Sequence, residues 1–381
     1  PHTGLVVDVE FSSDGSLILT VTAKLDGGGV KIWDARTREQ LCYHTGAGAF
    51  RHVAFSPERG AGDYLFVAAP EGVDSAQMYK ARTGEPVGEP LTYGGPLSDA
   101  DYPRTLRAMF DPDAKRIVTA SLAGHARVWS VPEGKLLQEL DHHHEALIAA
   151  MFSPDGRRIV TASEDGTAGI WQWNEAGSEF EFMQSLLHGS DRVVYAEFSP
   201  DSRNVATSSF DGSARIWTWD GEAYAPRAVM RHDKTVHLAR FSPAGRRLLT
   251  ASIDHTARVW DVQGGLPLSG PLRHDGIVTD ARWKRDGTQV VTAGADTAAR
   301  LWDLPPAPRG VVPEWVAEWG EAVAGLRINA NGAIEPVAVE KRLAMKQRIL
   351  ALPDDDYWAK TAKWTYANPK TRPITPFSHM G

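Results

Sequence analysis

A chain of 381 residues would ordinarily form two or three domains, and its 42% apolar and 23% charged composition excludes a disordered chain. The net charge of −7 disfavours nucleic acid as the main partner. No run approaches the roughly 18 apolar residues of a membrane segment and no signal-peptide pattern is present, so a cytoplasmic location is expected. A single cysteine, Cys42, excludes an internal disulfide and a cysteine-based zinc site. The start at Pro1-His2 favours a processed or partial chain.

A tryptophan phrase recurs along most of the chain. Between the first and last occurrences the mean period is about 45 residues, with Met78-Tyr79-Lys80 filling one wide gap. Seven repeats of this length are typical of four-stranded propeller blades. The tryptophan phrases are Ile32-Trp33-Asp34, Val128-Trp129-Ser130, Ile170-Trp171-Gln172, Ile216-Trp217-Thr218, Val259-Trp260-Asp261 and Leu301-Trp302-Asp303.

Each repeat also begins in a similar way. A histidine precedes a short apolar strand that ends in a phrase such as Phe152-Ser153-Pro154, and Pro154-Asp155-Gly156 then predicts a tight turn. A second strand covers residues 158–163, and a turn at Asp165-Gly166 leads into the tryptophan strand. Short strands separated by regular turn signals predict an all-β fold.

These phrases resemble the WD40-repeat family over residues 2–304, which implies a seven-bladed β-propeller spanning residues 1–304. In that family a histidine, a strand hydroxyl, a turn aspartate and the tryptophan are hydrogen-bonded within a blade. Thr161 and its equivalents are alternatives to the serine in each set, and the sequence leaves this choice open. The sets that match are His144/Ser163/Asp165/Trp171, His188/Ser209/Asp211/Trp217, His232/Ser252/Asp254/Trp260 and, without the hydroxyl, His274/Asp296/Trp302.

Residues 305–381 change to a helical periodicity and predict a small, mainly helical extension that caps the propeller. We expect residues 309–312 to close the last blade as its fourth strand. Helices are predicted after Pro313, over residues 339–352 and from Pro353 onward, with a hairpin turning at Asn331-Gly332 between the first two. This extension is similar to segments that follow WD40 arrays in bacterial multidomain proteins, among them receptor-type serine/threonine kinases. The resemblance implies fusion to, or association with, a signalling enzyme.

No catalytic, cofactor-binding or metal-ligating residue is predicted. His142-His143-His144 is the one histidine cluster, but neighbouring residues of an extended segment point to opposite sides and cannot easily hold one ion. The His–Asp–Ser sets recur from blade to blade, which indicates a structural network, because an active site occurs once. The chain is therefore predicted not to be an enzyme.

The resemblance implies that the face with the loops before each first strand, together with the central channel, docks proteins or peptides. Aromatic and arginine anchors among polar residues favour such binding. We expect a non-catalytic scaffold of a bacterial signalling assembly; the alternatives are a propeller hydrolase or lyase and an oligomerisation module working through the Trp-rich extension. The residues expected on the binding face are Glu164, Arg192, Tyr195, Phe210, Lys234, His237, Ile253, Asp101 and Tyr102.

Overall fold

The fold was analysed in a computed structural model of the chain. The structure describes residues 6–22, 29–45, 50–58, 64–70, 75–92, 105–122, 124–304, 315–324, 326–328, 334–353 and 357–367. They form two compact units, Pro1–Ala281 with Gly294–Thr297, and Arg282–Ala293 with Ala298–Gly381.

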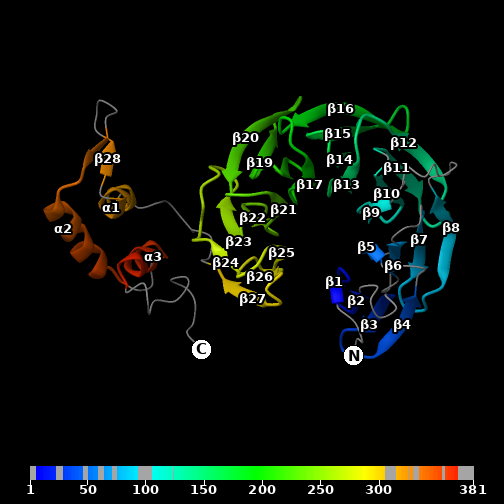
Figure 1. The fold of residues 1–381 in the computed structure, drawn as a ribbon, viewed down its shortest axis with the longest axis horizontal. Helices are drawn as coiled ribbons and strands as arrows, with labels where there is room; N and C mark the ends of the chain where they lie inside the picture. Colours follow the sequence, from blue (N-terminus) through cyan, green and yellow to red (C-terminus); the bar gives the residue numbers. More distant parts are fainter. Residues whose placement is uncertain are drawn as a thin grey trace. The chain divides into compact units, whose positions relative to one another are not determined.

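Seven antiparallel sheets follow one another along the chain as the blades of a β-propeller (Figure 1). Blade one contains β1 (Val6–Phe11), β2 (Leu17–Thr22), β3 (Gly29–Asp34) and β4 (Gln40–Thr45). Blade two contains β5 (Phe50–Phe55), β6 (Leu65–Pro70), β7 (Ser75–Lys80) and β8 (Pro86–Thr92). Blade three contains β9 (Thr105–Phe110), β10 (Arg116–Ser121), β11 (Ala126–Ser130) and β12 (Leu136–Leu140). Blade four contains β13 (Leu147–Phe152), β14 (Arg158–Ser163), β15 (Thr167–Asn174) and β16 (Glu179–Leu187).

The remaining blades continue the same order. Blade five contains β17 (Val193–Phe198), β18 (Asn204–Ser209), β19 (Ser213–Trp219) and β20 (Tyr224–Arg231). Blade six contains β21 (Val236–Phe241), β22 (Arg247–Ser252), β23 (Thr256–Asp261) and β24 (Leu272–Arg273). The described residues of blade seven form β25 (Val278–Trp283), β26 (Gln289–Gly294) and β27 (Ala299–Asp303). The closing strand expected at residues 309–312 lies outside the described residues.

Each blade is a meander, in which neighbouring strands follow one another along the chain. In blade four the turn between β13 and β14 is closed by the Ser153 hydroxyl, which donates to Asp155 Oδ1 over 2.5 Å, and Gly156 takes the positive φ of 69° that the turn requires. The first strand of the blade carries a β-bulge between Leu147 and Ala149. The same bulge recurs in β17 and β21, so the repeat fixes the register as well as the strand order.

The hydrophobic core lies between neighbouring blades. A cluster of buried side chains joins blades four and five, with Val160 and Ile170 on one side and Val205 and Trp217 on the other. Comparable clusters join blades one to two, two to three, three to four and five to six. A single blade therefore has no complete core, and its stability depends on its neighbours.

An arginine at the start of the second strand seals two of these junctions. Arg116 of blade three lies 4.7 Å from the centroid of Trp173 in blade four, and its Nη2 donates to Gly156 O over 3.1 Å. Arg158 of blade four lies 4.4 Å from the centroid of Trp219 in blade five. We call each of these an arginine plug, because one guanidinium spans the gap and stacks on the next blade.

The C-terminal extension contains α1 (Trp315–Ala324), β28 (Leu326–Ile328), β29 (Ile334–Pro336), α2 (Val339–Leu350) and α3 (Tyr357–Tyr366). The helix–hairpin–helix order predicted from the sequence is confirmed, and the turn predicted at Asn331-Gly332 lies outside the described residues. The three helices share a small core of Ala322, Met345, Ile349 and Ala362, against which Trp315 and Trp319 pack.

We predict that Arg158→Ala lowers the free energy of unfolding by about 2–3 kcal/mol, because it removes the stacking on Trp219 and hydrogen bonds to Gln172 and Tyr224. Chemical denaturation measures the effect. The neighbouring Arg157 is exposed, so Arg157→Ala serves as the control and should change stability by less than about 0.5 kcal/mol. Equal effects of the two substitutions would rule out a sealing role for Arg158.

Candidate functional site

A buried hydrogen-bonded set fixes the loops at one end of blades four, five and six, and blade six shows it most clearly. The Trp260 Nε1–H donates to Thr250 Oγ1 over 2.8 Å. The Thr250 hydroxyl lies 2.7 Å from His232 Nε2, and His232 Nδ1 lies 2.9 Å from Asp254 Oδ2. This chain of contacts joins the loop before β21 to the turn between β22 and β23, so the two loops hold one fixed geometry.

Blade five repeats the set. His188 Nε2 lies 2.6 Å from Thr207 Oγ1, and the Trp217 Nε1–H donates to the same oxygen over 2.9 Å. His188 Nδ1 is 3.5 Å from Asp211 Oδ2. The threonine hydroxyl of the second strand is therefore the shared hydrogen-bond partner of the tryptophan and the histidine, as in blade six.

In blade four the prediction of His144 as the histidine of the set is wrong. His143 Nδ1 lies 2.8 Å from Asp165 Oδ2, and its Nε2 lies 2.8 Å from Thr161 Oγ1. His144 is exposed, whereas His143 is buried. Successive residues of the loop point to opposite sides, so only one of them can enter the gap between the two strands.

The structure also decides between the two candidate hydroxyls in favour of threonine. The candidate serines are fully buried but make different hydrogen bonds; they are Ser163, Ser209 and Ser252. Each accepts the backbone N–H of the turn aspartate two residues later, over 3.0–3.1 Å. The serine orients the turn, and the threonine connects the tryptophan to the histidine.

Blade seven keeps the histidine–aspartate pair, with His274 Nδ1 3.0 Å from both carboxylate oxygens of Asp296. Gly294 takes the place of the serine, and a Cβ added there would collide with the His274 ring and the Asp296 carboxylate. Blades one and three retain the tryptophan–threonine half, Trp33 to Thr20 and Trp129 to Thr119. The aspartate position of blade three, Ala123, lies outside the described residues.

Burial controls the charge of these histidines. It lowers the pKa of His143, His188 and His232, so the neutral imidazole is favoured. The aspartate keeps its charge. Burial raises the pKa of Asp254, but hydrogen bonds from Thr256, His232 and the Asp233 backbone outweigh burial and lower this pKa to about 2. With Nδ1–H donating to the carboxylate, Nε2 is free to accept from the threonine hydroxyl.

Three of the residues expected on the binding face come together between blades four and five. Arg192 Nη1 donates to Glu164 Oε1 over 3.2 Å, and its guanidinium carbon lies 5.8 Å from the centroid of Phe210. The Arg192 side chain is 52% exposed and Phe210 is 49% exposed, so both remain accessible. We call Glu164, Arg192 and Phe210 the exposed cluster.

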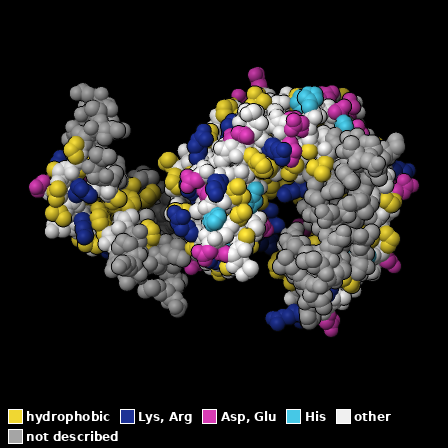
Figure 2. All heavy atoms as spheres, in the orientation of Figure 1, with side chains coloured by type: hydrophobic (Ala, Val, Ile, Leu, Met, Phe, Trp, Pro, Cys, Tyr) yellow, Lys and Arg dark blue, Asp and Glu magenta, His cyan; other side chains and the backbone are white. Residues whose placement is uncertain are grey.

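The next blade contributes to the same end of the strands. Lys234 is exposed and Ile253 is half-buried, and the Ile253 N–H donates to Thr235 O over 3.1 Å. His237 occupies the bulge of β21, and its Nε2–H donates to Thr279 O over 3.3 Å. Figure 2 shows basic, acidic and hydrophobic side chains interspersed over one face of the molecule. Asp101 and Tyr102 lie outside the described residues.

Tyr195 is not part of the exposed surface, contrary to the sequence prediction. It is 1% exposed, and its hydroxyl donates to Glu197 Oε2 over 2.7 Å. Guanidinium carbons of Arg107 and Arg240 lie 5.3 and 5.6 Å from the centroid of its ring. Burial raises the pKa of its phenol, so the hydroxyl stays protonated.

Charged residues that were not predicted from the sequence surround Tyr195. Arg107, Glu197 and Arg240 belong to the first strands of blades three, five and six, and Glu197 Oε1 accepts the Phe241 N–H of the next blade. A signal was present, because Glu197 and Arg240 occupy the same position, between an alanine and the phenylalanine that ends the strand.

The histidine cluster separates into different environments. The His142 ring stacks on Phe182 at 3.6 Å between centroids and lies 3.0 Å from Ser185 Oγ, whereas His143 belongs to the set described above. Within the described ranges, no group of three or more His, Cys, Asp or Glu side chains is arranged to hold a metal ion. No helix among the described residues is long and apolar enough to cross a membrane.

Seven consecutive antiparallel sheets define a β-propeller; six of them have four strands, and the last has three strands among the described residues. The family model of the WD domain, G-beta repeat (WD40), matches residues 1–34, 134–172, 181–218, 226–261 and 268–303. The repeats and the blade arrangement together show that the chain belongs to the WD40-repeat β-propellers. No curated protein matches the chain.

We predict that Thr207→Val lowers the free energy of unfolding by about 2–3 kcal/mol, because it leaves the Trp217 N–H and the His188 ring without their shared partner. The adjacent Ser208 is the control. Its side chain is fully buried and its hydroxyl has no hydrogen-bond partner among the described residues, so Ser208→Ala should cost less than about 0.5 kcal/mol. Equal losses in denaturant titrations would contradict the role of Thr207 as the shared hydrogen-bond partner.

We predict that thermal stability falls as the pH drops below about 6.5. The folded state lowers the pKa of His143, His188 and His232, so the unfolded state binds more protons there and stability rises with pH. The loss should begin before the turn aspartates titrate, since the pKa of Asp254 is about 2.

Differential scanning fluorimetry from pH 7.5 to 5.0 measures this dependence. His232→Asn should flatten the slope of Tm against pH, whereas His255→Asn, at an exposed turn position with a φ of 69° that asparagine tolerates, should leave the slope unchanged. A Tm that stays constant over this range, or the same slope in His232→Asn as in the unaltered protein, would refute the prediction.

Proposed function

We propose that the chain is a non-catalytic scaffold that binds a protein or peptide partner through the exposed cluster and the neighbouring Lys234, His237 and Ile253. WD40 propellers commonly act as protein-interaction scaffolds. The observation that carries the proposal is Phe210, an aromatic ring 49% exposed at a turn, with the Arg192 guanidinium beside it. Aromatic and arginine side chains are the residues most enriched at the energetic centres of protein interfaces.

The histidine sets argue for a structural role instead of catalysis. In blade five the Thr207 hydroxyl is fully buried, receives the Trp217 N–H and contacts His188. A hydroxyl enclosed in this way has no approach for a substrate and is not a nucleophile. The same arrangement recurs in blades four and six, as a structural network does.

The proposed setting is a bacterial signalling or regulatory assembly in the cytoplasm. It rests on the similarity of the C-terminal segment to those that follow WD40 arrays in multidomain proteins. The mixed charges of the exposed cluster favour a protein partner over nucleic acid, because Glu164 compensates Arg192 directly at 3.2 Å.

A photo-crosslinking amino acid at Phe210 tests this surface. We expect it to capture a discrete partner in native lysate, and the same probe at Val229, which is also 49% exposed but lies on the outer strand β20, to capture none. With the purified partner, Phe210→Ala combined with Arg192→Ala should weaken binding at least tenfold, because hot-spot truncations cost about 2 kcal/mol or more. Unchanged affinity in the double variant, measured by calorimetry, would refute the proposed surface.

A further inference from the structure

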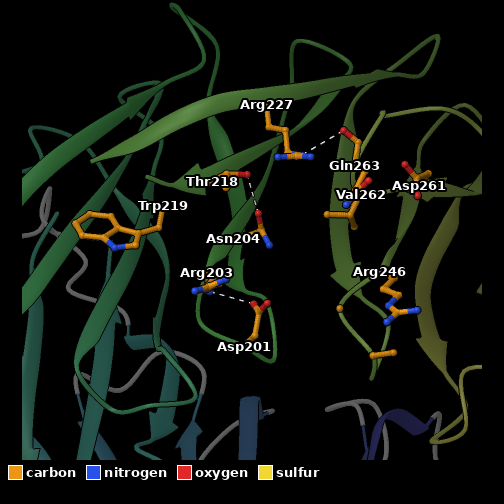
Figure 3. A pocket seen from close by; sticks show the side chains of 12 residues that line it. Asp201, Arg203, Asn204, Thr218, Trp219, Arg227, Arg246, Asp261, Val262 and Gln263 are labelled. Atoms are coloured by element: carbon orange, nitrogen blue, oxygen red, sulfur yellow. Dashed lines mark hydrogen bonds between the residues drawn. The ribbon is translucent and has the colours of Figure 1, made fainter. Parts of the chain in front are cut away.

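A cavity of about 730 Å³ lies between blades five and six (Figure 3). The strand register places it at the end of the strands opposite the exposed cluster. From blade five it is lined by the turn between β17 and β18, the first residue of β18, the last two residues of β19 and Arg227 of β20. From blade six it is lined by the turn between β21 and β22 and by the residues that follow β23. The lining residues are Asp201, Arg203, Asn204, Thr218, Trp219, Arg227, Ala244, Gly245, Arg246, Asp261, Val262 and Gln263.

The cavity occupies the position that an arginine plug fills at the two preceding junctions, between blades three and four and between blades four and five. Arg116 and Arg158 are the first residues of the second strand in blades three and four, and Asn204 holds this position in blade five. Arg158 Nε donates to Gln172 Oε1 over 2.8 Å. The guanidinium group also stacks on Trp219 of the next blade. Asn204 accepts from the equivalent Thr218 over 2.7 Å, and its short side chain ends there.

On the blade-six side of the cavity, the aromatic ring on which such an arginine stacks is also absent. Trp173 and Trp219, two residues after the blade tryptophan, are the rings on which Arg116 and Arg158 stack. Val262 occupies this position in blade six. The turn carrying Gly245 still packs against blade five, since a Cβ added at Gly245 would lie 3.4 Å from Pro200 Cδ. The blades therefore meet as elsewhere, and the missing side chains leave the cavity between them.

Three arginines surround the opening. Arg203, Arg227 and Arg246 are exposed, and among the described residues none of them forms an ion pair; Arg227 Nε donates to the Gln263 backbone oxygen over 3.2 Å. The two aspartates of the lining serve their own turns. Asp201 Oδ1 accepts from Ser199 and from the Arg203 backbone, and Asp261 Oδ2 accepts from the Gly264 backbone. The guanidinium groups are thus available to an external carboxylate.

We propose that this cavity, the junction pocket, binds an acidic peptide segment of a protein partner. A large apolar side chain of the peptide would fill the space beside Trp219 and Val262, and flanking glutamates or aspartates would pair with Arg203, Arg227 and Arg246. Carboxylates fit the lining better than phosphates or a nucleic-acid backbone, because its formal charge is only +1 (three arginines against two aspartates) and the chain carries −7 overall.

The junction pocket is independent of the face proposed above. In an antiparallel blade the turn between the first and second strands and the turn between the second and third lie at opposite ends of the sheet. Asp201 and Arg203 belong to the first kind of turn and Phe210 to the second. One chain therefore offers two separate sites, and a partner bound at one leaves the other open.

Fluorescence anisotropy with a labelled Asp-Glu-Phe-Glu-Asp peptide tests the proposal. The unaltered chain should bind this peptide in 50 mM NaCl and bind the Asn-Gln-Phe-Gln-Asn analogue at least tenfold more weakly. Arg203→Glu combined with Arg246→Glu should reduce affinity at least tenfold. Arg157→Glu is the control, because Arg157 holds the equivalent turn position at a junction that Arg158 already fills.

A second variant tests the cavity without removing its charges. Asn204→Arg combined with Val262→Trp rebuilds the arginine plug, so peptide binding should be lost while Tm stays equal or rises. Phe210→Ala combined with Arg192→Ala should bind the peptide normally, which separates this site from the proposed function. The proposal is overturned if the unaltered chain does not bind the peptide, if the rebuilt plug leaves affinity unchanged, or if Arg157→Glu weakens binding as much as the charge reversals. Tighter binding of a phosphoserine-containing peptide would overturn the assignment to carboxylates.

Discussion

The geometry of this protein depends on a buried threonine hydroxyl on the second strand of the blade. In blades four, five and six it accepts the N–H of the blade tryptophan and contacts the histidine of the preceding loop. Because the histidine also meets the turn aspartate, one oxygen connects two strands, a loop and a turn. The positions of Arg192 and Phe210 follow from it, since Phe210 directly precedes the aspartate of such a set and its N–H donates to Arg192 O. A rigid scaffold of this kind presents loop residues in a fixed arrangement, which reduces the entropy lost on binding.

A second repeated device, the arginine plug, works between blades. Arg116 and Arg158 each satisfy hydrogen bonds in their own blade and stack on an aromatic ring of the next. Both partners change together at the junction of blades five and six, where Asn204 and Val262 stand. The blades still pack through the cluster that includes Ala206, Phe241 and Leu248. At this junction the plug is absent and a cavity is present, while the blades stay packed against each other.

Much of the fold could be predicted from the amino-acid sequence, and the predictions that were wrong have specific physical causes. The blade period, the turn residues and the helix–hairpin–helix order of the extension follow from local patterns, and the structure agrees with them. The prediction that His144 belongs to the buried set was wrong because three consecutive histidines are equivalent in sequence. Only the positions of Thr161 and Asp165 in the folded blade show that His143 makes these contacts. Tyr195 was expected at the surface, but Arg107 and Arg240, from two other blades, cover its ring.

The sequence by itself determined the seven repeats, the strand order and the tight turns, because alternation, proline, glycine and aspartate act over a few residues. It also marked Arg192 and Phe210, whose contact follows from neighbouring elements of the repeat. Only the tertiary structure decided which histidine and which hydroxyl form the buried sets, how Tyr195 is enclosed, and where a junction stays unfilled. These features depend on side chains from different strands or blades meeting within a few ångströms, and no local pattern encodes that proximity.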